Sequence, residues 1–238
     1  MGRGPSIEGR KNAVDAQKAK VFTKLVREIA LAVKQGGGDP AGNSRLRLAV
    51  DRALDANMTR DKVEAAIKRA SGAGADASTE IRYEGYAPGG VAVLVDCVTD
   101  NPTRTVADVR HAFSKVGGNL GTSGSVAFQF AQVGQLWFET GADAALEDRL
   151  LEAALEAGAD DVQCVDGWCE VLTQPAALEQ VKKNLAEGGF VAQQARVTMR
   201  PGNPVAVAGE TAVEVQKLID RLEELDDVQD VFHNAELP

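Results

Sequence analysis

The sequence predicts an α+β protein built from three parts. They are an N-terminal three-helix domain (residues 1–75), a discontinuous α/β sandwich middle domain (residues 80–131 plus 206–238), and an inserted ferredoxin-like βαββαβ domain (residues 132–205). The spacing of apolar residues changes at Glu80 from a helical period to alternation, as expected where helices give way to strands. The residues just before this change, 71–79, are mostly small, which is typical of a linker.

Three helices are predicted in the N-terminal part. Residues 12–35 carry apolar side chains at helical spacing, so one face of this helix should be buried and the other should be cationic. Asn43 or Ser44 can cap a second helix and Thr59 a third, because these side chains accept hydrogen bonds from free N–H groups at a helix start. The predicted result is a three-helix module.

The middle domain is predicted to combine two distant stretches of the chain. Asn101 fits the N-cap of a helix that follows two strands, and residues 125–130 alternate like a half-buried strand. A sheet built from this stretch still needs a covering helix. Residues 206–238 can supply it, since Thr211 and Glu214 fit a capping box and a final strand follows.

The residues between these two stretches are predicted to form a domain of their own. Strands and helices alternate there in the order βαββαβ, the ferredoxin-like pattern. The strands are expected at residues 134–139, 161–165, 168–173 and 191–199, and the helices at residues 143–157 and 175–187. An insertion into the middle domain explains both why that domain is split and why this order is complete.

Charge is distributed unevenly along the chain. The 238 residues carry a formal net charge of -9, yet residues 1–72 hold 15 Lys and Arg against 8 Asp and Glu, and the rest hold 11 against 27. A basic module beside an acidic body favours contact with a polyanion, although a solvated basic helix bundle has the same composition. Neither a signal-like start nor an apolar run of spanning length is seen, so we expect a cytoplasmic protein with no membrane contact.

No group of residues predicts catalysis, and no cofactor or metal is expected. An enzyme needs a nucleophile or metal with a positioned base, whereas His111 is a lone histidine on the polar side of a predicted helix. The string GGNLGTSG follows a helix and precedes a strand, the reverse of a phosphate-binding loop. Three cysteines, an odd and sparse count, indicate reduced thiols. Cys164 and Cys169 should face each other across a hairpin, and zinc there would need two further ligands.

Several strings resemble one known family. YEGY and PGG within residues 83–90, RTVADVRHAF at residues 104–113 and KVGGNLGTSGSV at residues 115–126 are similar to the YebC family, which includes the mitochondrial translational activator of cytochrome oxidase. Further matches such as VFTKLVREI and NMTRD extend the resemblance over nearly the whole chain. The opening GRGPSIEGRKNA departs from the tryptophan-containing basic start of many members and resembles a second branch. The resemblance implies the same three-domain layout.

The resemblance and the charge distribution together predict a nucleic-acid-binding regulator of gene expression. A DNA-binding transcriptional regulator comes first, although no helix-turn-helix is obvious in the sequence. The alternative is a ribosome-associated translation factor that binds rRNA or tRNA and relieves stalling at proline-rich sequences. The acidic domains would then face the ribosome or another protein. An enzyme or small-ligand protein using the GGNLGTSG loop is the third class.

Phosphate contacts are predicted for cations of the basic helices and for residues that the resemblance carries over. The cations of the basic helices are Lys20, Lys24, Arg27, Arg45 and Arg47. The residues carried over from the motif are Arg104, Arg110 and Asn119.

Overall fold

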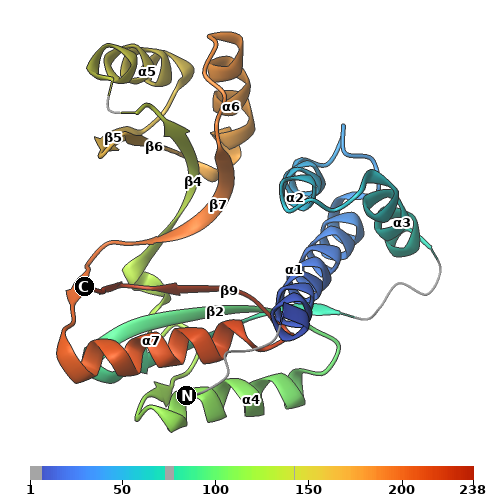
Figure 1. The fold of residues 1–238 in the computed structure, drawn as a ribbon, viewed down its shortest axis with the longest axis vertical. Helices are drawn as coiled ribbons and strands as arrows, with labels where there is room; N and C mark the ends of the chain where they lie inside the picture. Colours follow the sequence, from blue (N-terminus) through green and yellow to red (C-terminus); the bar gives the residue numbers. More distant parts are fainter. Residues whose placement is uncertain (1–6, 73–77, 142) are drawn as a thin grey trace. The chain divides into compact units, whose positions relative to one another are not determined.

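The computed structural model describes residues 7–72, 78–141 and 143–238, with side chains from residue 19 onward. The chain forms two compact units (Figure 1). Unit 1 comprises Met1–Ala127 and Pro204–Pro238, and unit 2 is Phe128–Asn203. Unit 1 therefore holds both the basic helices and the first sheet, which the sequence assigned to separate domains. Among the described residues, none of the helices has the length and apolar character needed to cross a membrane.

Unit 1 begins with three helices that share one core. They are α1 (Ile7–Gly36), α2 (Ser44–Asp55) and α3 (Arg60–Ala70). Ile29 and Leu46 are fully buried between them, as the helical spacing of apolar residues predicted. Asn43 caps α2, since its Oδ1 accepts the Leu46 N–H at 3.0 Å while its Nδ2 donates to the Ala32 carbonyl at 2.8 Å. Thr59 precedes α3 but makes no side-chain capping bond, so that detail of the prediction is wrong.

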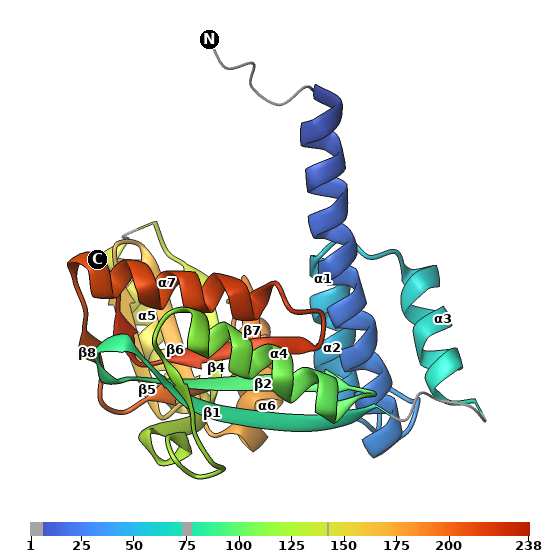
Figure 2. The same ribbon diagram turned by 90° about the horizontal axis from the view of Figure 1, so that it is seen from below.

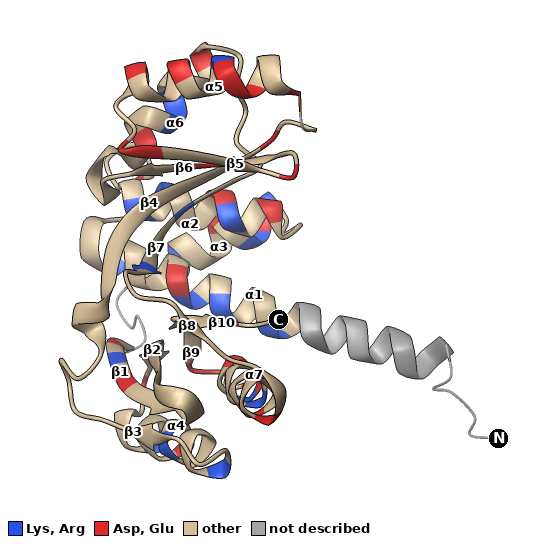
Figure 3. Ribbon diagram, turned by 90° about the vertical axis from the view of Figure 1, so that its left-hand side faces the viewer, with Lys and Arg blue, Asp and Glu red and all other residues tan. Residues whose placement is uncertain are grey.

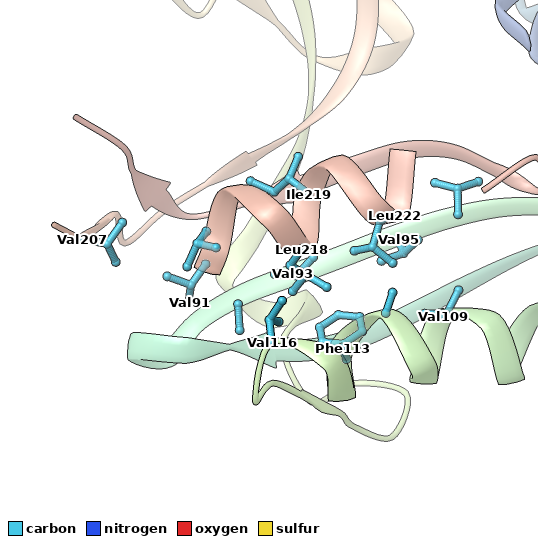
Figure 4. Packing of buried hydrophobic residues seen from close by; sticks show 14 of the residues in the cluster. Val91, Val93, Val95, Val109, Phe113, Val116, Val207, Leu218, Ile219 and Leu222 are labelled. Carbon is cyan, nitrogen blue, oxygen red and sulfur yellow. The ribbon is translucent and has the colours of Figure 1, made fainter. Parts of the chain in front are cut away.

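The first sheet of unit 1 has the strand order β3-β1-β2-β9, with every pair antiparallel. Its strands are β1 (Thr79–Ala87), β2 (Val91–Thr99), β3 (Asn119–Leu120) and β9 (Val228–His233). Helices α4 (Pro102–Lys115) and α7 (Gly209–Glu223) lie side by side along this sheet (Figure 2). Val93 and Val95 of β2 join Phe113 of α4 and Leu218 and Leu222 of α7 in one buried cluster (Figure 4). The C-terminal helix therefore covers a sheet formed mainly by residues more than 100 positions earlier in the chain.

Helix starts in this part of unit 1 follow the sequence signals only in part. Asn101 caps α4 as predicted, because its Oδ1 accepts the Arg104 N–H at 3.1 Å. Helix α7 instead begins after Ala208 without a side-chain cap, so the predicted capping box of Thr211 and Glu214 is wrong. A separate parallel pair, β8 (Val205–Ala206) with β10 (Ala235–Glu236), brings the two ends of this C-terminal stretch together.

The predicted strand at residues 125–130 is absent. Ala127–Gln129 forms the short 3-10 helix η2, and the next strand, β4 (Phe130–Glu139), begins only at Phe130. The physical reason is a buried carboxylate. The N–H groups of Val126 and Ala127, which a strand would offer to a neighbouring strand, both donate to Oε2 of Glu84 at 2.8 Å.

Unit 2 has the predicted ferredoxin-like arrangement. Its antiparallel sheet has the order β5-β6-β4-β7, which is the order expected for a βαββαβ chain. The remaining elements are α5 (Ala144–Ala157), β5 (Asp161–Val165), β6 (Trp168–Thr173), the short helix η3 (Pro175–Ala177), α6 (Leu178–Glu187) and β7 (Gln194–Pro201). Leu136, Leu150 and Leu178 are almost completely buried, so the strands and both helices share the core of this unit.

The cysteines of unit 2 correct the prediction of reduced thiols. Cys164 and Cys169 are register partners across the β5–β6 hairpin, as predicted, but they are joined by a disulfide with a Cα–Cα distance of 4.1 Å. A two-residue turn at Asp166 and Gly167 places them opposite each other. Glu147 brings a carboxylate oxygen near the two sulfurs, yet bonded sulfurs are not thiolates and so do not supply metal ligands of the usual kind.

Candidate nucleic-acid interface

The predicted phosphate contacts of α1 lie against the C-terminal end of α7. Lys24 Nζ donates to the Glu223 carbonyl at 2.8 Å, and Lys20 Nζ reaches the Glu224 carbonyl at 3.4 Å. Arg27 donates to the Asp226 carbonyl. The last carbonyls of a helix lack intrahelical partners and carry the negative end of its dipole. Lys20 and Lys24 therefore stabilise the end of α7, and Arg27 binds the turn that follows it, with the same groups that would contact a phosphate.

Burial at this contact changes the acid–base behaviour of Lys24. Desolvation lowers the pKa of its ammonium group, although the charges of Glu223 and Asp230 oppose the shift. The exposed residue Lys20 lies one helical turn earlier. Lys24 is therefore more buried than Lys20 and is held more firmly by contacts within the protein.

Asp227 links α1 and α4 to the segment between α7 and β9. Its carboxylate is almost buried, with 6% of the residue exposed. The carboxylate accepts hydrogen bonds from Arg104 at 2.9 Å and Thr105 at 2.8 Å, and Arg27 lies 3.2 Å away. Burial alone would raise the pKa of Asp227, but the hydrogen bonds from Arg104, Thr105 and Thr99 outweigh it and hold the pKa below its usual range. Two predicted phosphate contacts, Arg27 and Arg104, thus both pair with the buried carboxylate of Asp227.

The cations of α2 also face acidic residues of unit 1. Arg45 pairs with Glu80 of β1 at 2.9 Å and donates to the Gln35 side chain at 2.8 Å. Arg47 is half-buried on the same helix. Arg52, which the sequence analysis did not select, pairs with Glu28 at 2.8 Å. The guanidinium groups of Arg45 and Arg52 are therefore already engaged in ion pairs within unit 1.

The two remaining predicted contacts lie at the other end of α4. Arg110 is exposed on that helix, and no acidic partner is found for it among residues 19–72, 78–141 and 143–238. Asn119 is exposed on the short strand β3, opposite Tyr86 of β1. Within the described residues, no hydrogen bond or ion pair connects Arg110 or Asn119 to the cations of α1 and α2.

The GGNLGTSG loop is held by Glu84 of β1. The Glu84 carboxylate, in a residue only 4% exposed, accepts the N–H of Gly124 at 2.7 Å in addition to those of Val126 and Ala127. Burial would raise the pKa of Glu84, but the three N–H donors outweigh it and lower the pKa. Phosphate-binding loops offer such N–H groups to an anionic ligand. Here the protein's own carboxylate already occupies these three donors.

Three cations of α3, which the sequence analysis did not include among the contacts, also have no acidic partner within the described residues. Arg60, Lys68 and Arg69 are exposed, and within the part of the chain that the structure describes none of them has an acidic partner. The Lys62 ammonium lies 5.4 Å from the centre of the Phe22 ring. A signal for these residues was present in the sequence, since they occupy positions off the apolar stripe of the third predicted helix.

The connection between α2 and α3 also differs from expectation. Only residues 56–59 separate the two helices, and Asn57 has a left-handed backbone with φ of 62°. Helix-turn-helix units have connections of roughly three to four residues, and their second helix enters the major groove. Figure 3 shows Lys and Arg on α1, α2 and α3, and a run of Asp and Glu along α5. Helix α3 is therefore the second helix of a short-turn pair and carries free positive charge.

Comparison with known proteins gives consistent matches over both units. The family model described as the TACO1/YebC protein N-terminal domain matches residues 4–73, and the model described as the TACO1/YebC second and third domain matches residues 78–235. These two matches together cover almost the entire chain.

Similar proteins have names that concern gene regulation. A protein of Xanthomonas campestris is 59% identical over 240 residues, which cover 99% of this chain and 98% of that protein, and one of Stenotrophomonas maltophilia is 59% identical over 241 residues. Both are named probable transcriptional regulatory proteins. A crystal structure of a conserved hypothetical protein from Aquifex aeolicus superposes with a TM-score of 0.84 at 45% identity, covering 94% of this chain and 93% of the other.

Proposed function

The chain belongs to the TACO1/YebC family, and we propose on this basis that it regulates gene expression by binding nucleic acid. The names of its relatives concern transcriptional regulation, and we therefore propose DNA as the first target. The observation that carries the proposal is the free positive charge of α3. Arg60, Lys68 and Arg69 are exposed without acidic partners in the described residues, and phosphate contacts of this kind supply most of the affinity of non-specific nucleic-acid binding.

The phosphate contacts predicted from the sequence remain predictions. For Lys24, Arg27 and Arg104 a phosphate would have to replace existing bonds to carbonyl oxygens or to Asp227. Such an exchange recovers little, because a new ion pair is offset by the loss of the old one. We therefore propose that α3 makes the principal contact, and that Lys20 and Arg110, which are exposed, contribute further positive charge.

Salt dependence of binding tests this proposal. We would replace Arg60 and Lys68 together with Gln and follow the binding of labelled duplex DNA by fluorescence anisotropy over a range of salt concentrations. Each lost phosphate contact should lower the slope of log K against log salt by about 0.9. The control variant replaces Lys183 of α6 and Lys217 of α7, which removes the same charge elsewhere. An unchanged slope in the α3 variant, or an equal loss in the control, would contradict the proposal.

Translation on the ribosome is the second candidate, and the charge of unit 2 favours it. Residues 128–203 hold 12 Asp and Glu against 5 Lys and Arg, which suits contact with a basic protein rather than with a second nucleic acid. Sedimentation of cell lysate through a sucrose gradient distinguishes the two candidates. Co-migration with ribosomes that moderate salt removes would place translation first. Absence from ribosomes, with retention on duplex DNA at the same salt, would favour transcription.

A further inference from the structure

A cleft of about 200 Å³ lies between α1 and α3 and is bordered by the residues that flank the first sheet. Val26 and Ala30 of α1 and Ala66 and Ala70 of α3 give it an apolar lining. Leu31 of α1 also borders the cleft. The other four apolar side chains are short, so the two helices leave space here. Ligand pockets that enclose a drug-sized molecule have volumes of roughly 300–1,000 Å³, so this cleft fits only a part of a ligand, such as one flat ring system.

Charged groups surround this apolar lining on two sides. Arg27, Lys34 and Arg69 supply positive charge, and Asp100 supplies a carboxylate. Arg27 already pairs with Asp227 at 3.2 Å, which leaves Lys34 and Arg69 as the two cations without an acidic partner in the described residues. Lys34 Nζ donates one hydrogen bond to the Ser78 carbonyl at 3.3 Å, which leaves its other hydrogens available. Arg69 has no acidic partner in the described residues. Asp100 pairs through one oxygen with Arg104 at 3.0 Å, so its second oxygen can accept a further hydrogen bond.

We infer that the cleft binds one unstacked base of single-stranded nucleic acid, with the adjoining phosphates at Lys34 and Arg69. The inference rests on the proposed function and specifies the form of nucleic acid that the same module takes. A base has an apolar face and polar edges, and its backbone carries a charge on each side, which matches the apolar lining and the two cations. Asp100 repels phosphate but accepts from an exocyclic amine. A base with an amino group therefore fits better than uracil or thymine.

Duplex nucleic acid does not explain this cleft equally well. Bases in a duplex are stacked and paired, so a duplex presents phosphates to a helix surface but has no free ring to fill an apolar space. Contact through phosphates alone would use Arg69 and Lys34. It would leave the apolar side chains that line the cleft without a ligand. The apolar lining of the cleft, and not its positive charge, is therefore the feature that favours a single strand over a duplex.

Filling the cleft tests the inference. Ala70→Leu adds apolar volume to the cleft without changing charge, and Ala65→Leu makes the same change at an exposed position of α3 that does not line it. Binding of single-stranded RNA, single-stranded DNA and duplex DNA of one sequence would be compared by fluorescence anisotropy. Ala70→Leu should weaken single-strand binding about tenfold, because the added side chain fills the space that the base would occupy; tenfold corresponds to about 1.4 kcal/mol. It should leave duplex binding unchanged, and Ala65→Leu should change neither.

The arms of this experiment separate the possible failures. If Ala70→Leu binds single strands as the wild type does, the cleft takes no base and the inference fails, while salt-dependent duplex binding would leave the proposed function intact. If the wild-type protein binds none of the three probes, both fail. If Ala70→Leu lowers the affinity for single-stranded RNA and single-stranded DNA equally, the cleft recognises the base and does not distinguish ribose from deoxyribose. Circular dichroism checks that each variant is folded. If Ala70→Leu is not folded, the wild-type protein must bind a single strand of cytosine more tightly than one of uracil, because Asp100 accepts from the cytosine amine, or the inference is overturned.

Discussion

Replacement of Glu84 by Gln should selectively destabilise unit 1. In the native protein, Oε1 of Glu84 accepts the N–H of Gly124, and Oε2 accepts those of Val126 and Ala127. A glutamine has one acceptor oxygen and one NH₂ group. Whichever way the amide is turned, its NH₂ group faces at least one N–H donor. The substitution therefore leaves a buried or partly buried donor unsatisfied and makes the remaining hydrogen bonds neutral.

The magnitude follows from these three bonds. A hydrogen bond to a charged group contributes roughly 1.5–3 kcal/mol, and a buried donor left without a partner costs about 1–3 kcal/mol. We expect Glu84→Gln to lower the free energy of unfolding by about 3 kcal/mol, a large part of the roughly 5–15 kcal/mol of a typical domain. The control is Glu80→Gln on the same strand. Glu80 is exposed and pairs with Arg45 at the surface, and exposed pairs contribute about 0–1 kcal/mol.

The positions of the aromatic residues provide a readout for each unit. Trp137 and Trp168 are the protein's two tryptophans, and both belong to unit 2. Tryptophan emission during urea unfolding therefore follows unit 2, while circular dichroism also follows the helices of unit 1. Glu84→Gln should shift the circular-dichroism transition to lower urea and leave the tryptophan transition in place.

The pH dependence gives a second test. The folded pKa of Glu84 is lowered relative to the unfolded value of about 4.3. Its stabilising contribution is therefore complete above the unfolded pKa and is lost as the pH falls through the folded pKa. The difference between wild type and Glu84→Gln should be full at neutral pH and should narrow in acid. A difference below about 1 kcal/mol at neutral pH, or one that persists unchanged in acid, would refute this account of the loop.

Two further predictions concern backbone packing and thiols. Gly85→Ala should destabilise unit 1 by about 1–3 kcal/mol, because a Cβ there would lie 2.6 Å from the Asn119 carbonyl oxygen and 2.7 Å from Cε1 of Phe113. The control in urea unfolding is Gly42→Ala, whose Cβ has no neighbour closer than 4.0 Å. Equal stability of the two variants would contradict the prediction. Thiol titration of the denatured, unreduced chain should count only Cys97, since the other two cysteines are bonded, and three thiols would disprove the disulfide. In the folded protein burial raises the pKa of Cys97 to about 12, so it should react slowly at neutral pH.

Local signals in the sequence were enough to predict most of the elements. Asn43 and Asn101 cap helices because a side-chain oxygen and the N–H group that it binds are only three residues apart. The apolar period determines which face of each helix is buried, and the order of helices and strands in unit 2 admits few antiparallel sheets. These features depend on neighbours along the chain, so they could be predicted without knowing the fold.

Signals of equal strength failed where a distant group competed for the same atoms. Residues 125–130 alternate like a strand, but Glu84, which is 42 positions before Val126, takes their N–H groups. The sequence does not show that a carboxylate will be buried there, because its position depends on how β1 packs against the loop.

The sequence by itself determined that the N-terminal module is basic and helical, because charge count and apolar period are properties of composition and spacing. Only the tertiary structure decided which cations are free. Lys24 and Arg27 find their partners 199 residues away, at the end of α7 and in the turn that follows it, whereas Arg69 of α3 remains without an acidic partner in the described residues. An ion pair acts over a few ångströms in space, and separation along the chain says nothing about that distance until the fold brings the two groups together.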